Sequence, residues 1–526
     1  MSRASRPSDG PEPTDVPARR PRRAASDTAT PSSTEPTLAG VDAIADVTAA
    51  GAPNVDQKPT AASPEATSPR AKRPKSATTS TSTPRSKSKA GSAKAQARQA
   101  PPPPLAVVAD EAHQPVRQRP ARVTLAFPEH TTVGEVAGRS TPQRPWTRLV
   151  AARGRVRVNP PAGGLGIWLH DRAGDLELLA PLASDEAAAA GIGALWVDSA
   201  SVTADGVARI PLLPFLHELR LNAPVDDDAI APLARLLLLH RLDIGGTRTR
   251  GGALDSVLAG TPLLRALHLQ RTETTSEALA HLRRVPALTE LHLWATEVDD
   301  EALLAVASLA HLRILDLSNT GCTGQGLGAF DGSGSIQRLG LGGIAVGRAG
   351  LASLARLHPL RRLTMWGAEV GGPAPLAPLA ELPALTHLDV CGTQVGADDL
   401  LALADAPSLK SLCLRGLPVG PAGLAAIGKL RHLERLDLRG ADIDDRGCRS
   451  FGALRKLRTL DLSNTAVGDR GLRHLAGLPK LASLELSRTD VTDAGLGALM
   501  ACPSLRDVKA DRTLTSKRAL APFAAR

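Results

Sequence analysis

Aromatic residues are scarce in this chain. None of its 526 residues is Tyr, and only five are Phe and five are Trp. The cores of β-sandwiches and β-barrels are built largely from β-branched and aromatic side chains. The composition therefore argues against either architecture.

Long apolar runs and cysteine motifs are also missing. No run approaches the about 18 residues that cross a bilayer, and Met1 to Gly10 lead into polar sequence without the apolar stretch of a signal peptide. The five cysteines are odd in number, and no CxxC pair points to zinc. These absences predict a cytoplasmic monomer in a reducing compartment, with no membrane contact, no disulfide framework and no cofactor.

The net charge of +10 is concentrated near the N-terminus. Residues 1–120 hold 18 Lys and Arg against 11 Asp and Glu, whereas residues 121–526 are nearly balanced at 45 against 42. The same N-terminal region has 19 of the 42 prolines and no aromatic residue. Such a stretch buries too little apolar surface to offset its ordering entropy. We therefore predict that residues 1–120 form a disordered head.

One segment of the head is purely basic. Residues 70–98 contain nine Lys and Arg and no acidic residue. Such clusters act as import signals or as arms that bind polyphosphates, and a solvated linker has the same composition. No aromatic residue is interleaved for base stacking, which favours the linker. The candidate nucleic-acid contacts are Lys72, Arg73, Lys75, Arg85, Lys87 and Lys89.

The rest of the chain repeats. The triplet Leu288-x-x-Leu291-x-Leu293 recurs in about 14 units, whose middle residues are spaced by 24 with one step of 23 and two of 25. Those middle residues are Leu195, Leu219, Leu242, Leu267, Leu291, Leu315, Leu339, Leu363, Leu388, Leu412, Leu436, Leu460, Leu484 and Val508.

Each unit has two halves. The triplet alternates like a short strand, whereas Leu496 and Leu499 in the second half have helical spacing, with Thr492 or Asp493 placed to cap the helix. Neither half can bury its apolar face alone, so the units must stack. The pattern predicts an α/β solenoid with a parallel inner sheet and outer helices.

These motifs resemble the leucine-rich repeat family, whose fold is a horseshoe. Where its commonest pattern has Asn or Cys, this chain has Thr, which implies a turn bonded by a hydroxyl: Thr272, Thr296, Thr320, Thr393, Thr465, Thr489 and Thr513. Residues 491–503 are similar to the cysteine-containing repeats of F-box proteins and to bacterial GALA-type effectors. We assign residues 121–191 to an N-terminal cap, with strands at 148–158 and 163–169 and a helix at 175–190, and residues 192–526 to the repeats.

The register also predicts which side chains face the concave surface. Trp294 and Trp366 lie there three strands apart, with Gly340 and Gly342 leaving a bare floor between them. Two indoles beside a flat floor are typical of an interface hot spot, although the rings could instead cover the sheet. Trp196 should pack under the cap, and Trp146 and Trp168 should lie in the cap's core.

Charged side chains share this face. His268, His292 and Asp316 occupy consecutive strands, as a hydrogen-bonded ladder or, less simply, as metal ligands; protonated histidines would repel each other near pH 6.5. Asp389, Arg415 and Arg439 complete the predicted partner-binding set. A face with both signs of charge fits a protein better than a phosphate backbone.

No catalytic constellation stands out, so the sequence predicts a non-enzymatic scaffold that binds a protein partner through its concave face. Export into a host cell as a bacterial effector fits the same features. Two alternatives stay open. A ubiquitin-ligase adaptor would need a helix pair within residues 121–191, and a nucleic-acid-associated factor would be anchored by the basic segment.

Overall fold

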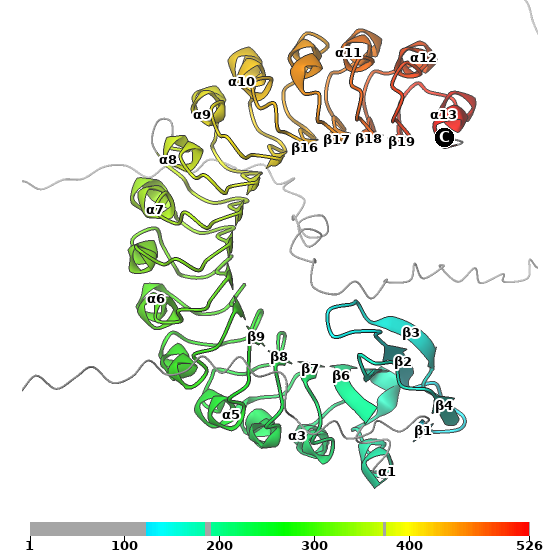
Figure 1. Ribbon diagram of the computed structural model, residues 1–526, viewed down its shortest axis with the longest axis vertical. Coiled ribbons are helices and arrows are strands. Elements are labelled where there is room, and N and C mark those ends of the chain that lie inside the picture. The colour runs from blue at the N-terminus through cyan, green and yellow to red at the C-terminus, as the bar shows by residue number, and fades with distance from the viewer. Residues whose placement is uncertain (1–122, 185–190, 372–374, 525–526) are drawn as a thin grey trace, which may run out of the picture.

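The computed structural model describes residues 123–184, 191–371 and 375–524. Those residues form a curved solenoid, with short strands along the inner, concave side of an arc and helices along the outer side (Figure 1). The predicted disordered head and its basic segment lie outside the described residues.

The concave side is a parallel sheet in continuous register. Each middle leucine pairs with the middle leucine of the next strand, for example Leu291 with Leu315 and Leu315 with Leu339. The strands of this sheet are β6 (Ile192–Asp198), β7 (Glu218–Asn222), β8 (Arg241–Asp243), β9 (Ala266–His268), β10 (Glu290–His292), β11 (Ile314–Asp316), β12 (Arg338–Gly340), β13 (Arg362–Thr364), β14 (His387–Asp389), β15 (Ser411–Cys413), β16 (Arg435–Asp437), β17 (Thr459–Asp461), β18 (Ser483–Glu485) and β19 (Asp507–Lys509).

The outer layer mixes α-helices with 3-10 helices. Thr492 caps α12 by accepting from the backbone N–H of Ala494, as its position predicted. The outer elements are α3 (Ala204–Arg209), η4 (Ile210–Leu212), α4 (Asp227–Ile230), η5 (Ala231–Arg235), α5 (Leu254–Gly260), η6 (Glu277–Arg284), α6 (Asp300–Ala307), η7 (Gly326–Phe330), α7 (Gly347–Leu354), α8 (Ala377–Ala380), α9 (Ala397–Leu403), α10 (Gly420–Ile427), η8 (Gly447–Ala453), α11 (Asp469–Leu475), α12 (Asp493–Leu499) and α13 (Lys517–Ala524). None of the described helices is long and apolar enough to span a bilayer.

The core lies between the two layers. The middle leucines from Leu195 to Leu484 are at most 2% exposed, whereas Val508 in the last strand is only half-buried. Burying each such side chain contributes about 1.5–3 kcal/mol, and stacking is what removes it from water. The 24-residue period is therefore the length of one coil, and the middle leucine marks the same buried position in each.

In the coils that carry the predicted threonine, the turn after the strand confirms its role. Thr272, Thr296 and Thr489 each donate their hydroxyl to the carbonyl three residues earlier, at 2.6, 2.6 and 2.7 Å. The residue before this threonine has a left-handed backbone conformation. Ala295 has a φ of 54°, and in other coils a glycine such as Gly392 occupies the same position.

The N-terminal cap extends the sheet. Its strand β2 (Gly134–Gly138) pairs antiparallel with β3 (Thr147–Ala151) and β5 (Leu165–His170), and β5 continues in parallel to β6. A separate antiparallel pair joins β1 (Val123–Ala126) to β4 (Arg155–Val158), and the 3-10 helix η3 (Asp171–Ala173) and helix α1 (Leu179–Ser184) follow β5.

The tryptophans of this region divide between core and surface. Trp146 is 8% exposed and meets Trp196 edge-on, with ring centroids 4.9 Å apart, so Trp196 packs under the cap as predicted. The prediction for Trp168 was wrong. It pairs across the sheet with Trp196 and lies half-buried on that face, because it alternates with the buried Ile167 and Leu169.

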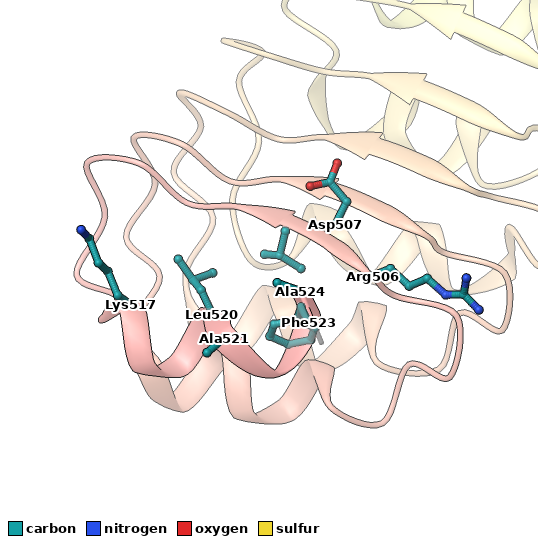
Figure 2. Close-up of a pocket in the computed structure, with 8 residues that line it drawn as sticks. Arg506, Asp507, Lys517, Leu520, Ala521, Phe523 and Ala524 are labelled. Atoms are coloured by element: carbon teal, nitrogen blue, oxygen red, sulfur yellow. The ribbon is translucent and has the colours of Figure 1, made fainter. Parts of the chain in front are cut away.

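The C-terminal end is covered by α13. Phe523 of this helix is 1% exposed, and the helix packs beside β19. Figure 2 shows the open pocket of about 290 Å³ that remains between them, lined by Val508, Leu520 and Phe523 with Arg506, Asp507 and Lys517 at its rim.

Candidate interaction surface

Three columns of side chains form the concave face. The first column directly precedes the middle leucine of each strand, the second directly follows it, and the third lies two residues after the second. Their members are mostly half-buried, because each side chain stands beside its equivalents on neighbouring strands. Contacts between neighbouring strands therefore decide what the face presents.

The bare glycine floor predicted between Trp294 and Trp366 does not exist. A Cβ atom added at Gly342 would lie 2.2 Å from Cε2 of Trp366, so the indole lies directly over this glycine. The side chain of Asp316 reaches over Gly340 in the same way. Both tryptophans are half-buried, and the indole nitrogen of Trp294 is buried without an acceptor among the described residues. Trp366 thus covers the sheet, which was the alternative reading.

The predicted ladder of His268, His292 and Asp316 is organised by a residue outside it. Glu290 lies on the strand next to that of His268. One of its carboxylate oxygens is 2.9 Å from Nε2 of His268 and 3.2 Å from Nε2 of His292, within hydrogen-bonding distance of both rings. Nδ1 of His268 lies 3.7 Å from a carboxylate oxygen of Asp243, and Nδ1 of His292 lies 3.9 Å from a carboxylate oxygen of Asp316. We call these five residues together with Arg241 the histidine cluster.

Charges in the histidine cluster compensate one another. Burial alone would lower the pKa of His268, but hydrogen bonds to Asp243 and Glu290 outweigh it and raise that pKa. Burial alone would raise the pKa of Asp243, but its contacts with His268 outweigh burial and lower that pKa. Glu290 joins the Nε2 atoms of the two rings, whose centroids lie 4.4 Å apart. The predicted repulsion between protonated histidines stays a prediction.

Two imidazoles and a carboxylate at this spacing could hold a metal. A cation already occupies the centre, however. Arg241 donates to both oxygens of Glu290, at 3.2 and 3.0 Å, and its Nη1 lies 3.0 Å from Nε2 of His268. A metal ion would have to displace this guanidinium, so the geometry favours the ladder.

Further along the sheet, carboxylates occupy the same column on β14, β16, β17 and β18, and the last of them pairs with Lys509 of β19 at 2.7 Å. We call Asp389, Asp437, Asp461 and Glu485 the carboxylate column. Burial raises the pKa of Asp461, and the charges of Asp437 and Glu485 raise it further; burial and Asp437 raise the pKa of Asp389. Cations stand beside the column: Arg415 donates to Asp437 at 2.7 Å, and Arg439 is exposed.

A third group was not predicted. One and two residues before the middle leucine, strands β11 to β15 carry Arg313, Arg338, Arg361, Arg362 and Lys410, and no Asp or Glu. We call these five the basic strip. The signal is present in the sequence at the two positions before the middle leucine, whereas the predicted contact residues all follow that leucine.

The basic strip acts on a histidine in its midst. Burial lowers the pKa of His387 to about 4, and the nearby charges of Arg362, Arg435, Arg338 and Lys410 contribute to that shift. The strip is therefore a region of concentrated positive potential along the edge where the strands begin.

The cysteines fall into two groups. Cys391 and Cys413, on adjacent strands of the concave face, form a disulfide, which corrects the prediction of reduced cysteines without bridges. Cys322, Cys448 and Cys502 are buried thiols outside this bridge; burial raises the pKa of Cys322 to about 11 and of Cys448 to about 12. Sequence spacing did not suggest the pair, because 22 residues is neither a motif nor a full repeat.

Comparison with known proteins supports the repeat assignment. The leucine-rich repeat family model matches three consecutive 24-residue segments, 429–452, 453–476 and 477–500. The chain thus contains leucine-rich repeats. Nothing in the comparisons shows the narrower likeness to F-box proteins or GALA-type effectors, and no protein of curated function matches the chain in sequence.

Similar solved structures include an internalin of Listeria monocytogenes, with 23% identity over 57% of this chain and 82% of that chain and a TM-score of 0.44. A leucine-rich repeat protein of Leptospira interrogans has 16% identity over 66% and 96%, with a TM-score of 0.44. The plant peptide hormone receptor RGFR1, in complex with RGF2, has 13% identity over 62% and 64%, with a TM-score of 0.35. At these identities and scores the likeness says nothing of function.

Proposed function

We propose that this leucine-rich repeat protein is a non-enzymatic scaffold that binds a protein partner through its concave face, and that the partner offers an acidic segment to the basic strip. The observation that carries the proposal is the strip itself, in which five basic side chains gather at the starts of four strands, β11, β12, β13 and β15, with no acidic residue at the same positions of β14 between them. An acidic ligand would relieve their mutual repulsion and be steered to this edge.

The neighbouring charges favour a protein over a nucleic acid. Asp389 lies in β14, the strand that begins at His387 in the strip, and Asp437 follows two strands on. These carboxylates would repel a phosphate backbone, whereas a protein can meet both signs of charge. None of the strip residues is aromatic, so bases would have nothing to stack on there.

The predicted contact residues take distinct roles in this proposal. Trp294 and Trp366 supply apolar area, and Asp389, Arg415 and Arg439 meet opposite charges on the partner. His268, His292 and Asp316 form a rigid floor, since both nitrogens of each ring face carboxylates. For the same reason neither ring is free to act as a general base, which supports binding rather than catalysis.

The adaptor alternative gains no support from the described residues. A ligase-binding helix pair was to lie within residues 121–191, but the described part of that region holds strands β1 to β5, a 3-10 turn and the six-residue α1. An effector exported into a host cell would use the same concave surface as a resident scaffold. The basic segment of the nucleic-acid alternative lies outside the described residues.

The proposal can be tested with a fluorescent oligoglutamate peptide and the full chain. Replacing Arg361 and Lys410 by Glu should weaken binding at least tenfold, because both side chains are exposed on the strip. The matched control replaces Arg470 and Arg473 by Glu in α11 of the outer layer, with the same change in net charge. It should change affinity less than twofold.

Two outcomes would count against the proposal. Equal losses in both variants would mean that only net charge matters. Tighter binding of single-stranded DNA than of oligoglutamate, lost in the strip variant, would assign the strip to nucleic acid instead.

A further inference from the structure

The Cys391–Cys413 pair stands at a defined point of the concave face. Cys413 pairs across the sheet with Asp389, and Cys391 follows Asp389 by two residues, so the bridge runs diagonally between adjacent strands. The Cα atoms are 5.9 Å apart and both side chains are half-buried. This bridge is open to reagents in the concave groove, unlike the three buried cysteines.

Asp389 completes a converging set. One carboxylate oxygen of Asp389 and the two Sγ atoms lie within 4.8 Å of one another. The carboxylate accepts from the backbone N–H of Cys391 at 3.0 Å, which holds it beside the sulfurs. No ion pair to Asp389 occurs among the described residues, because Arg415 is bound to Asp437 at 2.7 Å.

Two sulfurs and one carboxylate suit a particular class of cation. Thiolates select soft or borderline ions, and Zn²⁺ accepts Cys and Asp together in a tetrahedral site. With Zn–S distances of about 2.3 Å, tetrahedral geometry places two thiolates about 3.8 Å apart. Rotation of the cysteine side chains can open that separation while the paired strands stay in place.

We propose that this pair is a redox-gated metal site: as a disulfide it excludes metal, and as two thiols it binds one Zn²⁺ with Asp389. The protein supplies three ligands, and the fourth position faces the concave groove, where water or a partner's side chain can enter. This proposal is independent of the basic strip.

A phosphine can reduce the Cys391–Cys413 disulfide to two thiols. The phosphine gives two electrons to the sulfur–sulfur bond, each sulfur takes a proton, and an oxygen from water leaves on the phosphine as its oxide. When Zn²⁺ binds, each thiol releases its proton to the buffer and coordinates as thiolate. Metal binding therefore releases two protons and blocks the return to the disulfide.

Co²⁺ is the probe for the test, because thiolate ligands give it a charge-transfer absorption that oxygen and nitrogen ligands do not. The full chain, reduced with phosphine, should bind one equivalent with this absorption, be displaced by Zn²⁺, and show none in the disulfide form. Cys391→Ser and Cys413→Ser should each weaken binding at least tenfold and reduce the absorption. Asp389→Asn should weaken binding at least tenfold with the absorption retained.

The matched control is Cys322→Ala, which removes a buried free cysteine and should leave Co²⁺ binding unchanged. Circular dichroism checks that every variant is folded. Binding that persists in the Cys391→Ser, Cys413→Ser double variant would place the metal elsewhere and overturn the proposal. Equal binding by the disulfide form would refute the gate, and unchanged affinity in Asp389→Asn would refute the three-ligand site.

Discussion

Four members of the histidine cluster, Asp243, His268, His292 and Asp316, lie in the same column of the sheet as the carboxylate column, yet a carboxylate in each group has its pKa shifted in the opposite direction. Asp243 stands beside His268 and has a lowered pKa, whereas Asp461 stands between Asp437 and Glu485 and has a raised one. Both are half-buried and follow the middle leucine directly. The neighbouring strand, and not the position in the repeat, therefore decides the state of a carboxylate.

This difference separates two uses of one surface. In the histidine cluster, the two histidines on adjacent strands share Glu290 and are flanked by Asp243 and Asp316, so charges of opposite sign satisfy one another and the cluster stabilises the fold. In the carboxylate column and the basic strip, like charges gather, which leaves potential for a partner. The half nearer the cap contains the histidine cluster, from β8 to β11, and the half from β11 onward contains the basic strip and the carboxylate column.

The largest expected effect comes from removing the centre of the histidine cluster. Glu290→Gln should lower the free energy of unfolding by about 3 kcal/mol, because it leaves Arg241 and two imidazoles without their shared carboxylate. Urea unfolding measures the change. A loss below about 0.5 kcal/mol, typical of surface substitutions, would mean that the cluster is not what stabilises this half.

A smaller loss is expected where the two halves meet. Gly342→Ala should cost about 1 kcal/mol, because its new methyl group must push away the Trp366 indole. The displaced ring should also shift the tryptophan fluorescence. Gly497→Ala on α12, where nothing lies within 4 Å of the new Cβ, is the control and should not destabilise; equal effects would show that the indole does not rest on Gly342.

The histidine cluster should also make stability depend on pH. The raised pKa of His268 means that the folded protein holds this proton more tightly than the unfolded chain does. The contribution is thus complete below about pH 6.5, the ordinary histidine value, and is lost as the pH rises through the raised pKa. Melting temperatures of wild type and His268→Gln, compared across this range, should converge at high pH; a constant gap would contradict the coupling to Asp243 and Glu290.

The smallest effect belongs to the carboxylate column. Asp461→Asn removes a charge that repels Asp437 and Glu485 but keeps an oxygen to accept from the backbone N–H of Ser463. We expect a gain of at most about 0.5 kcal/mol in urea unfolding. A clear loss of stability would show that the two halves do not differ as described.

Much of the fold was readable from the sequence. The leucine period predicted the strands, their parallel register and the concave columns, because one buried position per coil repeats without exception from Leu195 to Leu484. The threonine turn was readable for the same reason, since Thr272 and its equivalents recur at one place in the repeat. The cap strands β1 and β2 were not predicted, whereas β3, β4 and β5 lie largely within the predicted segments. Without a repeat, each cap strand had to be judged from its own few residues, and those of β2 include two glycines.

The site was harder to predict, since it depends on contacts between strands in different columns. Glu290 was not singled out because it precedes the middle leucine, yet it joins His268 to His292. The Trp366 ring could have pointed either way from its column, and only its position over Gly342 decides. The repeat register shows which side chains are neighbours, whereas the rotamer of each side chain decides which neighbour it contacts.

The parallel pairing of β19 with β18 makes the molecule extendable at one end. Every coil contacts its immediate neighbours through the same register, and α13 closes the last coil as a separate helix. A 24-residue cassette copied from residues 477–500 and inserted directly after residue 500 would keep the existing last coil and α13 as its terminator. The concave face could thus be lengthened by design one coil at a time.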